Sequence, residues 1–379
     1  MNANLWSQNH PRNFWHCHPD PPDEIWQNAI EVSLPILGLD SSSVTLDSFL
    51  ELSLGESRFG PNHWRLSLPK RMYYILKPLL PRVLTRFLRQ HYQNPKQVAK
   101  QISWPIEDHY VKFLWNVLAE VLKSVPNVKP APLWPDGHRF AFILTHDVED
   151  ADGQKFIPAV ADLEEEFGFR SSFNFVPERY SIDLGLVDEL RQRGFEIGIH
   201  GLNHDGKLFS SRKEFERRAA RINQYLREFD AVGFRSPLTH RNPEWMQALN
   251  IEYDLSFFDA DPFEPIPGGT MNVYPFFIGH FVELPYTLVQ DYTLTAVLNQ
   301  HTPNLWLDKV EFLREVHGMV LLNSHPDYLK SPENFRIYSA FLSAMHIQND
   351  AWHALPRDAA CWWRVRTEVP VQEMIPVPA

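Results

Sequence analysis

Residues 140–150 read FAFILTHDVED, a run of five apolar residues that is followed by a threonine, a histidine and three acidic side chains. A short apolar run with a polar boundary is typical of a buried strand. Similar runs, separated by longer segments with helical patterns, occupy residues 172–176, 196–199, 231–234, 253–257, 281–284 and 319–322. Strands that alternate with helices predict a parallel sheet with helical crossovers. Seven such units favour a closed or nearly closed α/β barrel, and an open doubly wound sheet is the alternative.

Polar side chains follow five of these predicted strands. The residues concerned are Asp147 and Glu149 after the first strand, His200 and His204 after the third, Arg235 after the fourth, Asp254 and Asp259 in and after the fifth, and His325 after the seventh. The carboxyl ends of parallel strands open on one face of a barrel, and that face holds the active site. We therefore expect these side chains to converge.

Each cluster taken alone has an ordinary structural interpretation. His200 and His204 could be two surface histidines, although their spacing of four also suits a metal ion. Asp147 and Glu149 share one face of an extended segment, where they could serve as base and ligand or simply cap a helix. His325 could be a buried structural histidine. Taken together, two histidines, two carboxylates, an arginine and a further histidine predict a catalytic metal site with an open coordination position.

In order and spacing, these motifs resemble the polysaccharide deacetylase family, also called NodB-homology or carbohydrate esterase family 4. The resemblance covers about residues 138–330. Its motifs correspond here to Thr145–Glu149 (usually T-F-D-D), His200 to His204 (H-x-x-x-H), Arg235 to Pro237 (R-x-P), Asp254 or Asp259 (a looser motif around an aspartate) and His325 (an apolar strand ending in histidine). The family implies a distorted (β/α)7 barrel, to which this chain adds a mainly helical N-terminal region.

The sequence departs from the family at the second aspartate of the first motif, where Val148 stands. Some relatives place this metal ligand two residues after the base, and that position is Glu149 here; Asp150 is a weaker candidate. The resemblance then implies a divalent metal ion, zinc in the first instance, on Glu149, His200 and His204.

The resemblance also implies roles for the remaining polar residues. Asp147 would accept a proton from the attacking water, and Arg235 would hold that carboxylate ionised and aligned. His325, kept protonated by Asp254 or Asp259, would donate a proton to the departing amine. The products would be acetate and a free amino sugar.

Three functions stay open at this point. The first is deacetylation of an N-acetylated sugar in a glycan or glycan precursor that is free, lipid-linked or nucleotide-linked. The second is hydrolysis of another C–N bond, such as a cyclic amide, because a fold does not fix its substrate. The third is a catalytically silent carbohydrate-binding scaffold, in which Val148 and Glu149 would be signs of decay.

The composition changes near residue 137, because seven of the twelve tryptophans precede it. We predict a mainly helical region over 1–123, a proline-rich linker over 124–137 (SVPNVKPAPLWPDG), the barrel over 138–330 and a helical C-terminal extension over 331–379. Residues 70–93 carry six basic residues and no acidic one. This segment predicts either a helix that contacts an anionic membrane surface or, as we prefer, an amphipathic helix packed on the barrel.

Charge and cysteine content narrow the function classes. The net charge of −11 argues against nucleic acid as a partner, because phosphate binding needs a basic surface. Cys17 and Cys361 are too few for a disulfide framework or a cysteine zinc cluster, so any metal must be held by His, Asp and Glu. We expect a cytoplasmic protein, since neither a signal peptide pattern nor a membrane-spanning apolar stretch is visible.

Overall fold

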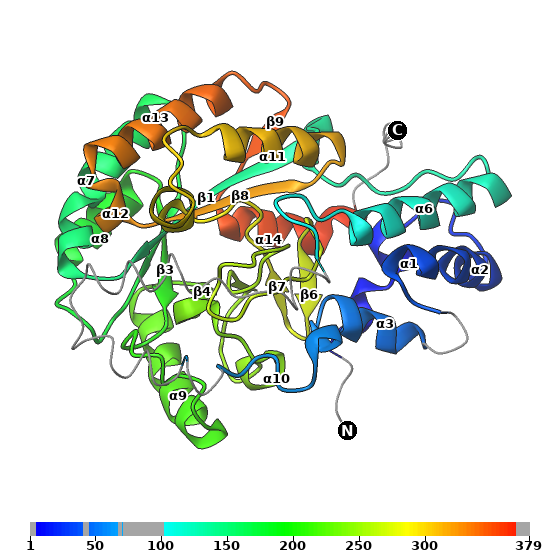
Figure 1. Ribbon diagram of the computed structural model, residues 1–379, viewed down its shortest axis with the longest axis horizontal. Helices are drawn as coiled ribbons and strands as arrows, with labels where there is room; N and C mark the ends of the chain where they lie inside the picture. Colours follow the sequence, from blue (N-terminus) through cyan, green and yellow to red (C-terminus); the bar gives the residue numbers. More distant parts are fainter. Residues whose placement is uncertain (1–4, 41–44, 67–69, 71–101, 369–379) are drawn as a thin grey trace.

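The computed structural model of the chain describes residues 5–40, 45–66, 70 and 102–368 (Figure 1). The basic segment 70–93, for which a helix is predicted, lies outside the described residues except for Lys70. Within the described ranges, none of the helices is both long and apolar enough to span a membrane.

A curved, mostly parallel sheet forms the centre of the molecule (Figure 1). All seven predicted strands are present: β1 (Phe140–Val148), β2 (Ser172–Phe175), β3 (Glu196–His200), β4 (Gly233–Arg235), β5 (Tyr253–Asp254), β7 (Phe281–Glu283) and β8 (Met319–Ser324). Two short strands were not predicted, β6 (Phe276–Ile278) and β9 (Ala351–His353). The order across the sheet is β6-β7-β5-β4-β3-β2-β1-β8, and among the described strand pairs only β6–β7 is antiparallel.

The sheet curls into a distorted (β/α)7 barrel because the chain after β7 takes the place of a strand. Pro285 lacks a backbone N–H and interrupts regular pairing. The following residues then turn toward β8, where Thr287 N donates to Leu321 O at 3.1 Å and Leu288 forms a parallel bridge with Leu322. This closure brings the carboxyl end of β8 next to the segment that follows β7.

Helices cover the outer faces of the sheet, and all of them except α14, which follows the last described strand, lie between strands in the sequence (Figure 1). They are α7 (Ala151–Glu166), α8 (Leu184–Gln192), α9 (Arg212–Glu228), α10 (Pro243–Met246), α11 (Asn304–Glu315), α12 (Pro326–Leu329), α13 (Pro332–His346) and α14 (Pro356–Val365). Asp150, the last residue of the stretch 140–150, has a structural role. The Asp150 side chain accepts hydrogen bonds from the backbone of Asp152 and Gly153, so it caps α7.

The N-terminal region packs against the barrel through a continuous apolar core. Its helices are α1 (Pro11–Trp15), α2 (Asp23–Ser33), α3 (Leu46–Ser53) and α6 (His109–Ser124). Trp115 Nε1 on α6 donates to Tyr274 Oη at 3.0 Å. In the proline-rich segment, Trp134 is buried and its Nε1 donates to His317 O at 2.9 Å. Residues 331–368 supply α13 and α14, and they also add β9 to the sheet beside β1.

Candidate metal and catalytic site

The structure brings together the three predicted metal ligands. Glu149 follows β1, His200 ends β3, and His204 lies in the loop after β3. One ligand atom from each residue lies within 4.8 Å of the other two. His204 Nε2 and Glu149 Oε1 are 2.9 Å apart. Two imidazole nitrogens and a carboxylate oxygen are a donor set that suits zinc and similar divalent ions.

A tight turn makes this arrangement possible. Gly201 has φ of +66°, and a Cβ there would lie 2.4 Å from Pro237 Cγ. Only glycine therefore fits at position 201, where the backbone after His200 packs against Pro237. Beyond the turn, Arg218 on α9 holds the loop through Asp205, with Nη1 and Nη2 at 2.7 and 2.9 Å from the two carboxylate oxygens. The backbone thus returns His204 to the mouth of the barrel.

His200 has the hydrogen-bonding pattern of a metal ligand. Its Nδ1 lies 3.1 Å from the backbone oxygen of Arg235, which requires the proton to be on Nδ1. Its Nε2 is buried and has no hydrogen-bond partner among the residues that the structure describes. A buried nitrogen with a free lone pair is rare unless a ligand completes it. Burial lowers the pKa of His200 to about 4, against the opposing effect of Asp147, so the imidazole is neutral at neutral pH.

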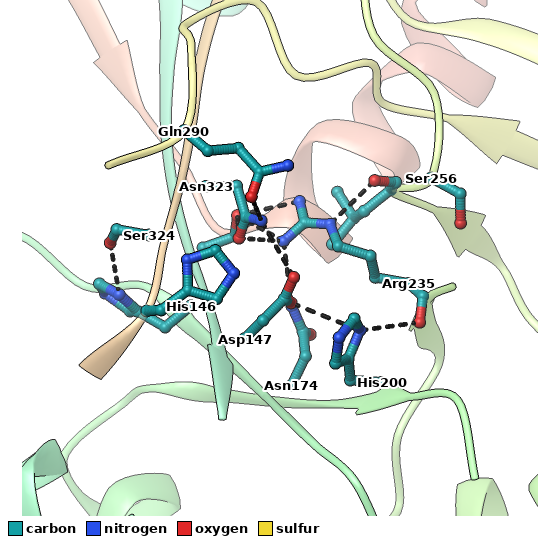
Figure 2. Close-up of polar contacts among 12 residues, drawn as sticks. His146, Asp147, Asn174, His200, Arg235, Ser256, Gln290, Asn323 and Ser324 are labelled. Carbon is teal, nitrogen blue, oxygen red and sulfur yellow. Dashed lines mark hydrogen bonds and ion pairs between the residues drawn. The ribbon is translucent and has the colours of Figure 1, made fainter. Parts of the chain in front are cut away.

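Asp147 lies beside these ligands in a dense hydrogen-bond network (Figure 2). Its Oδ1 accepts hydrogen bonds from Asn174 Nδ2 and Arg235 Nη1, both at 3.1 Å, and its Oδ2 accepts one from Asn323 Nδ2 at 2.9 Å. Burial by itself would raise the pKa of Asp147, but Arg235 and His200 hold it well below its usual value. The carboxylate is therefore ionised and fixed in orientation.

Arg235 is fully buried beneath Asp147. It donates from Nε to Leu255 O at 2.9 Å and from Nη1 to Asn323 Oδ1 at 2.5 Å. Both terminal nitrogens also reach Thr145 Oγ1 at 3.0 Å. A buried guanidinium with this many acceptors is held rigidly, and it supplies the positive charge that Asp147 needs.

His325 lies on the opposite side of the cluster and pairs with an aspartate that the sequence analysis did not identify. Asp291 Oδ1 is 2.8 Å from His325 Nδ1, and Asp291 Oδ2 accepts a hydrogen bond from His325 N at 2.9 Å. The other ring nitrogen, Nε2, is 4.0 Å from Glu149 Oε1. Although burial lowers the pKa of His325, Asp291 and Glu149 raise it to about 10, so the ring is protonated at neutral pH.

The two aspartates expected to support His325 have other partners. Asp254, at the end of β5, accepts from Ser256 Oγ at 2.8 Å, and the adjacent carboxyl group of Glu283 pairs with it. Asp259 forms a buried ion pair with Lys309 of α11, with the Oδ2 and Nζ atoms 2.6 Å apart. Asp291 thus has the position that the sequence analysis assigned to Asp254 or Asp259. The reason is that the chain after β7, rather than β5, passes next to β8.

Sequence reasoning also missed two amides next to Asp147. Asn174 stands in the middle of the apolar run 172–176, and Asn323 follows the apolar run 319–322 within β8. A polar residue inside an otherwise apolar strand is a usable signal, because a buried amide needs a partner. For Asp291 the available signal was weaker, an acidic residue after the apolar stretch 284–289.

Comparison with known proteins agrees with this fold. No protein-family model matches the sequence, and no curated protein matches it. Among solved structures, a putative polysaccharide deacetylase from Mycobacterium smegmatis is similar at 20% identity and a TM-score of 0.53, covering 65% of this chain and 97% of that one. A probable polysaccharide deacetylase from Pseudomonas aeruginosa PAO1 is similar at 16% identity and a TM-score of 0.51, covering 62% and 94%. The chain therefore has the polysaccharide deacetylase fold that its motifs predict.

Proposed function

We propose that this protein is a metal-dependent hydrolase of C–N bonds that removes the acetyl group from an N-acetylated sugar. The proposal rests on one observation above all. Glu149, His200 and His204 gather three ligand atoms beside the ionised carboxylate of Asp147, and no group in the described part of the chain forms a hydrogen bond with the buried Nε2 of His200. The likeness to two deacetylase structures supports the same class of reaction.

In the proposed reaction, Asp147 and His325 have different roles beside the metal ion. A divalent metal ion, zinc in the first instance, would lower the pKa of a water molecule and polarise the amide carbonyl. Asp147 is ionised and oriented by three donors, so it can accept a proton from that water. His325 is protonated beside Asp291, so it can donate a proton to the leaving amine. At neutral pH the proposed base, Asp147, is thus ionised and the proposed acid, His325, is protonated, as amide hydrolysis requires.

The first test is metal content. Elemental analysis of purified wild-type protein should find about one equivalent of a divalent ion, and the double variant His200→Ala/His204→Ala should lose it. The matched control is His301→Ala/His346→Ala, which removes two exposed histidines elsewhere and should keep the metal. If wild-type protein takes up no stoichiometric metal even after incubation with zinc, the hydrolytic proposal fails and a silent binding scaffold takes its place.

The second test is product analysis. Wild-type protein should release acetate from at least one member of a panel of N-acetylated sugars in free, nucleotide-linked and lipid-linked form. Asp147→Asn should reduce turnover by about 10²–10⁴-fold, the usual contribution of a general base, while it keeps the metal. Hydrolysis of cyclic amides without acetate release from any sugar would keep the C–N hydrolase and reject the deacetylase.

A further inference from the structure

A chain of hydrogen bonds leads from Asp147 to a loop at the mouth of the barrel. Asn323 Nδ2, which donates to Asp147, also lies 3.4 Å from Gln290 Oε1 (Figure 2). Gln290 Nε2 in turn donates to Glu264 Oε1 at 2.6 Å. The second oxygen of Glu264 accepts a hydrogen bond from Thr239 Oγ1 at 2.8 Å. Glu264 therefore joins the loop after β5 to the loop after β4.

The direction of these hydrogen bonds depends on Glu264. Glu264 Oε1 accepts a hydrogen bond from Gln290 Nε2, so the Gln290 amide turns its nitrogen toward Glu264 and its oxygen toward Asn323. Asn323 then presents its nitrogen to both Gln290 and Asp147, while its oxygen receives Arg235 Nη1. The position of Glu264 thus helps to determine how Asp147 is held.

One residue of the N-terminal region fixes both loops. Glu56 lies just after α3, and its carboxylate pairs with Nε and Nη2 of Arg241, with Nε at 2.5 Å. It also accepts a hydrogen bond from Gly269 N at 2.9 Å. Arg241 connects Glu56 to the loop after β4, because its Nη1 donates a hydrogen bond to Thr239 O at 2.8 Å. Glu56 is 5% exposed and Arg241 is 1% exposed, so the pair is shielded from water.

The local geometry indicates that these contacts are specific. Glu56 has φ of +58°, an uncommon conformation for a residue with a side chain, and such outliers are kept where the surroundings demand them. Opposite it, a Cβ on Gly269 would lie 2.1 Å from Asp259 O, so only glycine can bring its N–H to Glu56. The chain after α3 comes close in space to α10 (Figure 1), where the ring centroids of Trp64 and Trp245 are 4.9 Å apart.

We propose that Glu56 is a positioning residue of the active site. By tying Arg241 and Gly269 together it holds the loops that carry Thr239 and Glu264, and through Gln290 and Asn323 it sets the hydrogen bonds around Asp147. The N-terminal region is then part of the catalytic unit rather than an appended module. The expected effect on turnover rests on the proposed function, whereas the expected effect on the loops does not.

The test uses the full chain and three variants. Glu56→Gln keeps the size of the side chain and removes its charge, and Glu56→Asp keeps the carboxylate. The control Asn116→Ala removes a hydrogen bond inside the N-terminal region, from Asn116 Nδ2 to Ser33 Oγ at 2.9 Å. Each variant is measured for hydrogen exchange over residues 237–242 and 259–270, for metal content, and for kcat and KM of acetate release.

We expect Glu56→Gln to raise exchange in both loops and to lower kcat by about tenfold, with KM and metal content close to wild type. Glu56→Asp should recover part of both losses, and Asn116→Ala should change neither. Unchanged loop exchange in Glu56→Gln would overturn the proposal, and so would raised exchange with an unchanged kcat. If the wild type turns over no substrate, the proposed function fails, and the exchange measurement alone still decides whether Glu56 holds the loops.

Discussion

Gly198 provides a sharp test of how Asp147 is held. It lies on β3 directly opposite Asn174 of β2. A Cβ on residue 198 would lie 2.1 Å from Asn174 Oδ1 and 3.1 Å from its Cγ. Since Cβ contacts shorter than 3.0 Å are essentially never seen, the Asn174 amide would have to retreat by about 1 Å in a close-packed interior. That movement would break or lengthen the 3.1 Å hydrogen bond to Asp147.

The expected cost of Gly198→Ala combines two terms. Overpacking a core costs about 1–3 kcal/mol. Losing a hydrogen bond to a charged group costs about 1.5–3 kcal/mol. We therefore expect the free energy of unfolding to fall by roughly 2.5–6 kcal/mol, measured by urea titration with tryptophan fluorescence.

A double-mutant cycle tests the contact between residues 174 and 198. Asn174→Ala removes the amide that Gly198→Ala would strike. In that background, Gly198→Ala should cost less than about 1 kcal/mol, because the other near neighbour of the added methyl group, Gly233 O at 3.6 Å, is at an ordinary van der Waals distance. If Gly198→Ala costs the same in both backgrounds within about 0.5 kcal/mol, the contact between residues 174 and 198 is not the cause and the argument is refuted.

Two buried carboxyl groups away from the metal ligands give further predictions. Glu196 accepts hydrogen bonds from Tyr253 Oη at 2.8 Å and Arg357 N at 3.1 Å, and burial raises its pKa to about 7. The folded protein then retains a proton that the unfolded chain has lost, so stability should fall as pH rises from about 4.5 to about 7. Glu196→Gln should remove about 3 kcal/mol of this fall, as urea unfolding at pH 5 and pH 8 would show, and an unchanged pH dependence would reject it. Lys309→Met should cost about 3–5 kcal/mol at pH 8, because it leaves Asp259 without its cation. The loss should be smaller at pH 5, since burial raises the pKa of Asp259 to about 6 and the carboxyl group can take up a proton; equal losses at both values would contradict this.

The sequence determined the barrel and much of its site because the signals involved are local. Apolar runs mark the strands, and a strand end in a parallel barrel lies on the functional face wherever its neighbours are. Asp147, Glu149, His200, Arg235 and His325 could therefore be assigned to one face from their positions after apolar runs. Their roles in catalysis are proposals, but their location on one face of the barrel could be predicted from the sequence alone.

Only the tertiary structure decided which distant groups meet. Asp291 pairs with His325 because the chain after β7 occupies the place of a strand beside β8. The sequence pattern of residues 284–291 does not predict this position. Glu56 and Arg241 are 185 positions apart, and their pairing depends on how the N-terminal region folds over the barrel. Such contacts are set by distances across packed elements rather than by spacing along the chain. Strand positions are thus encoded locally, whereas the partners of each buried charge are encoded by the whole fold.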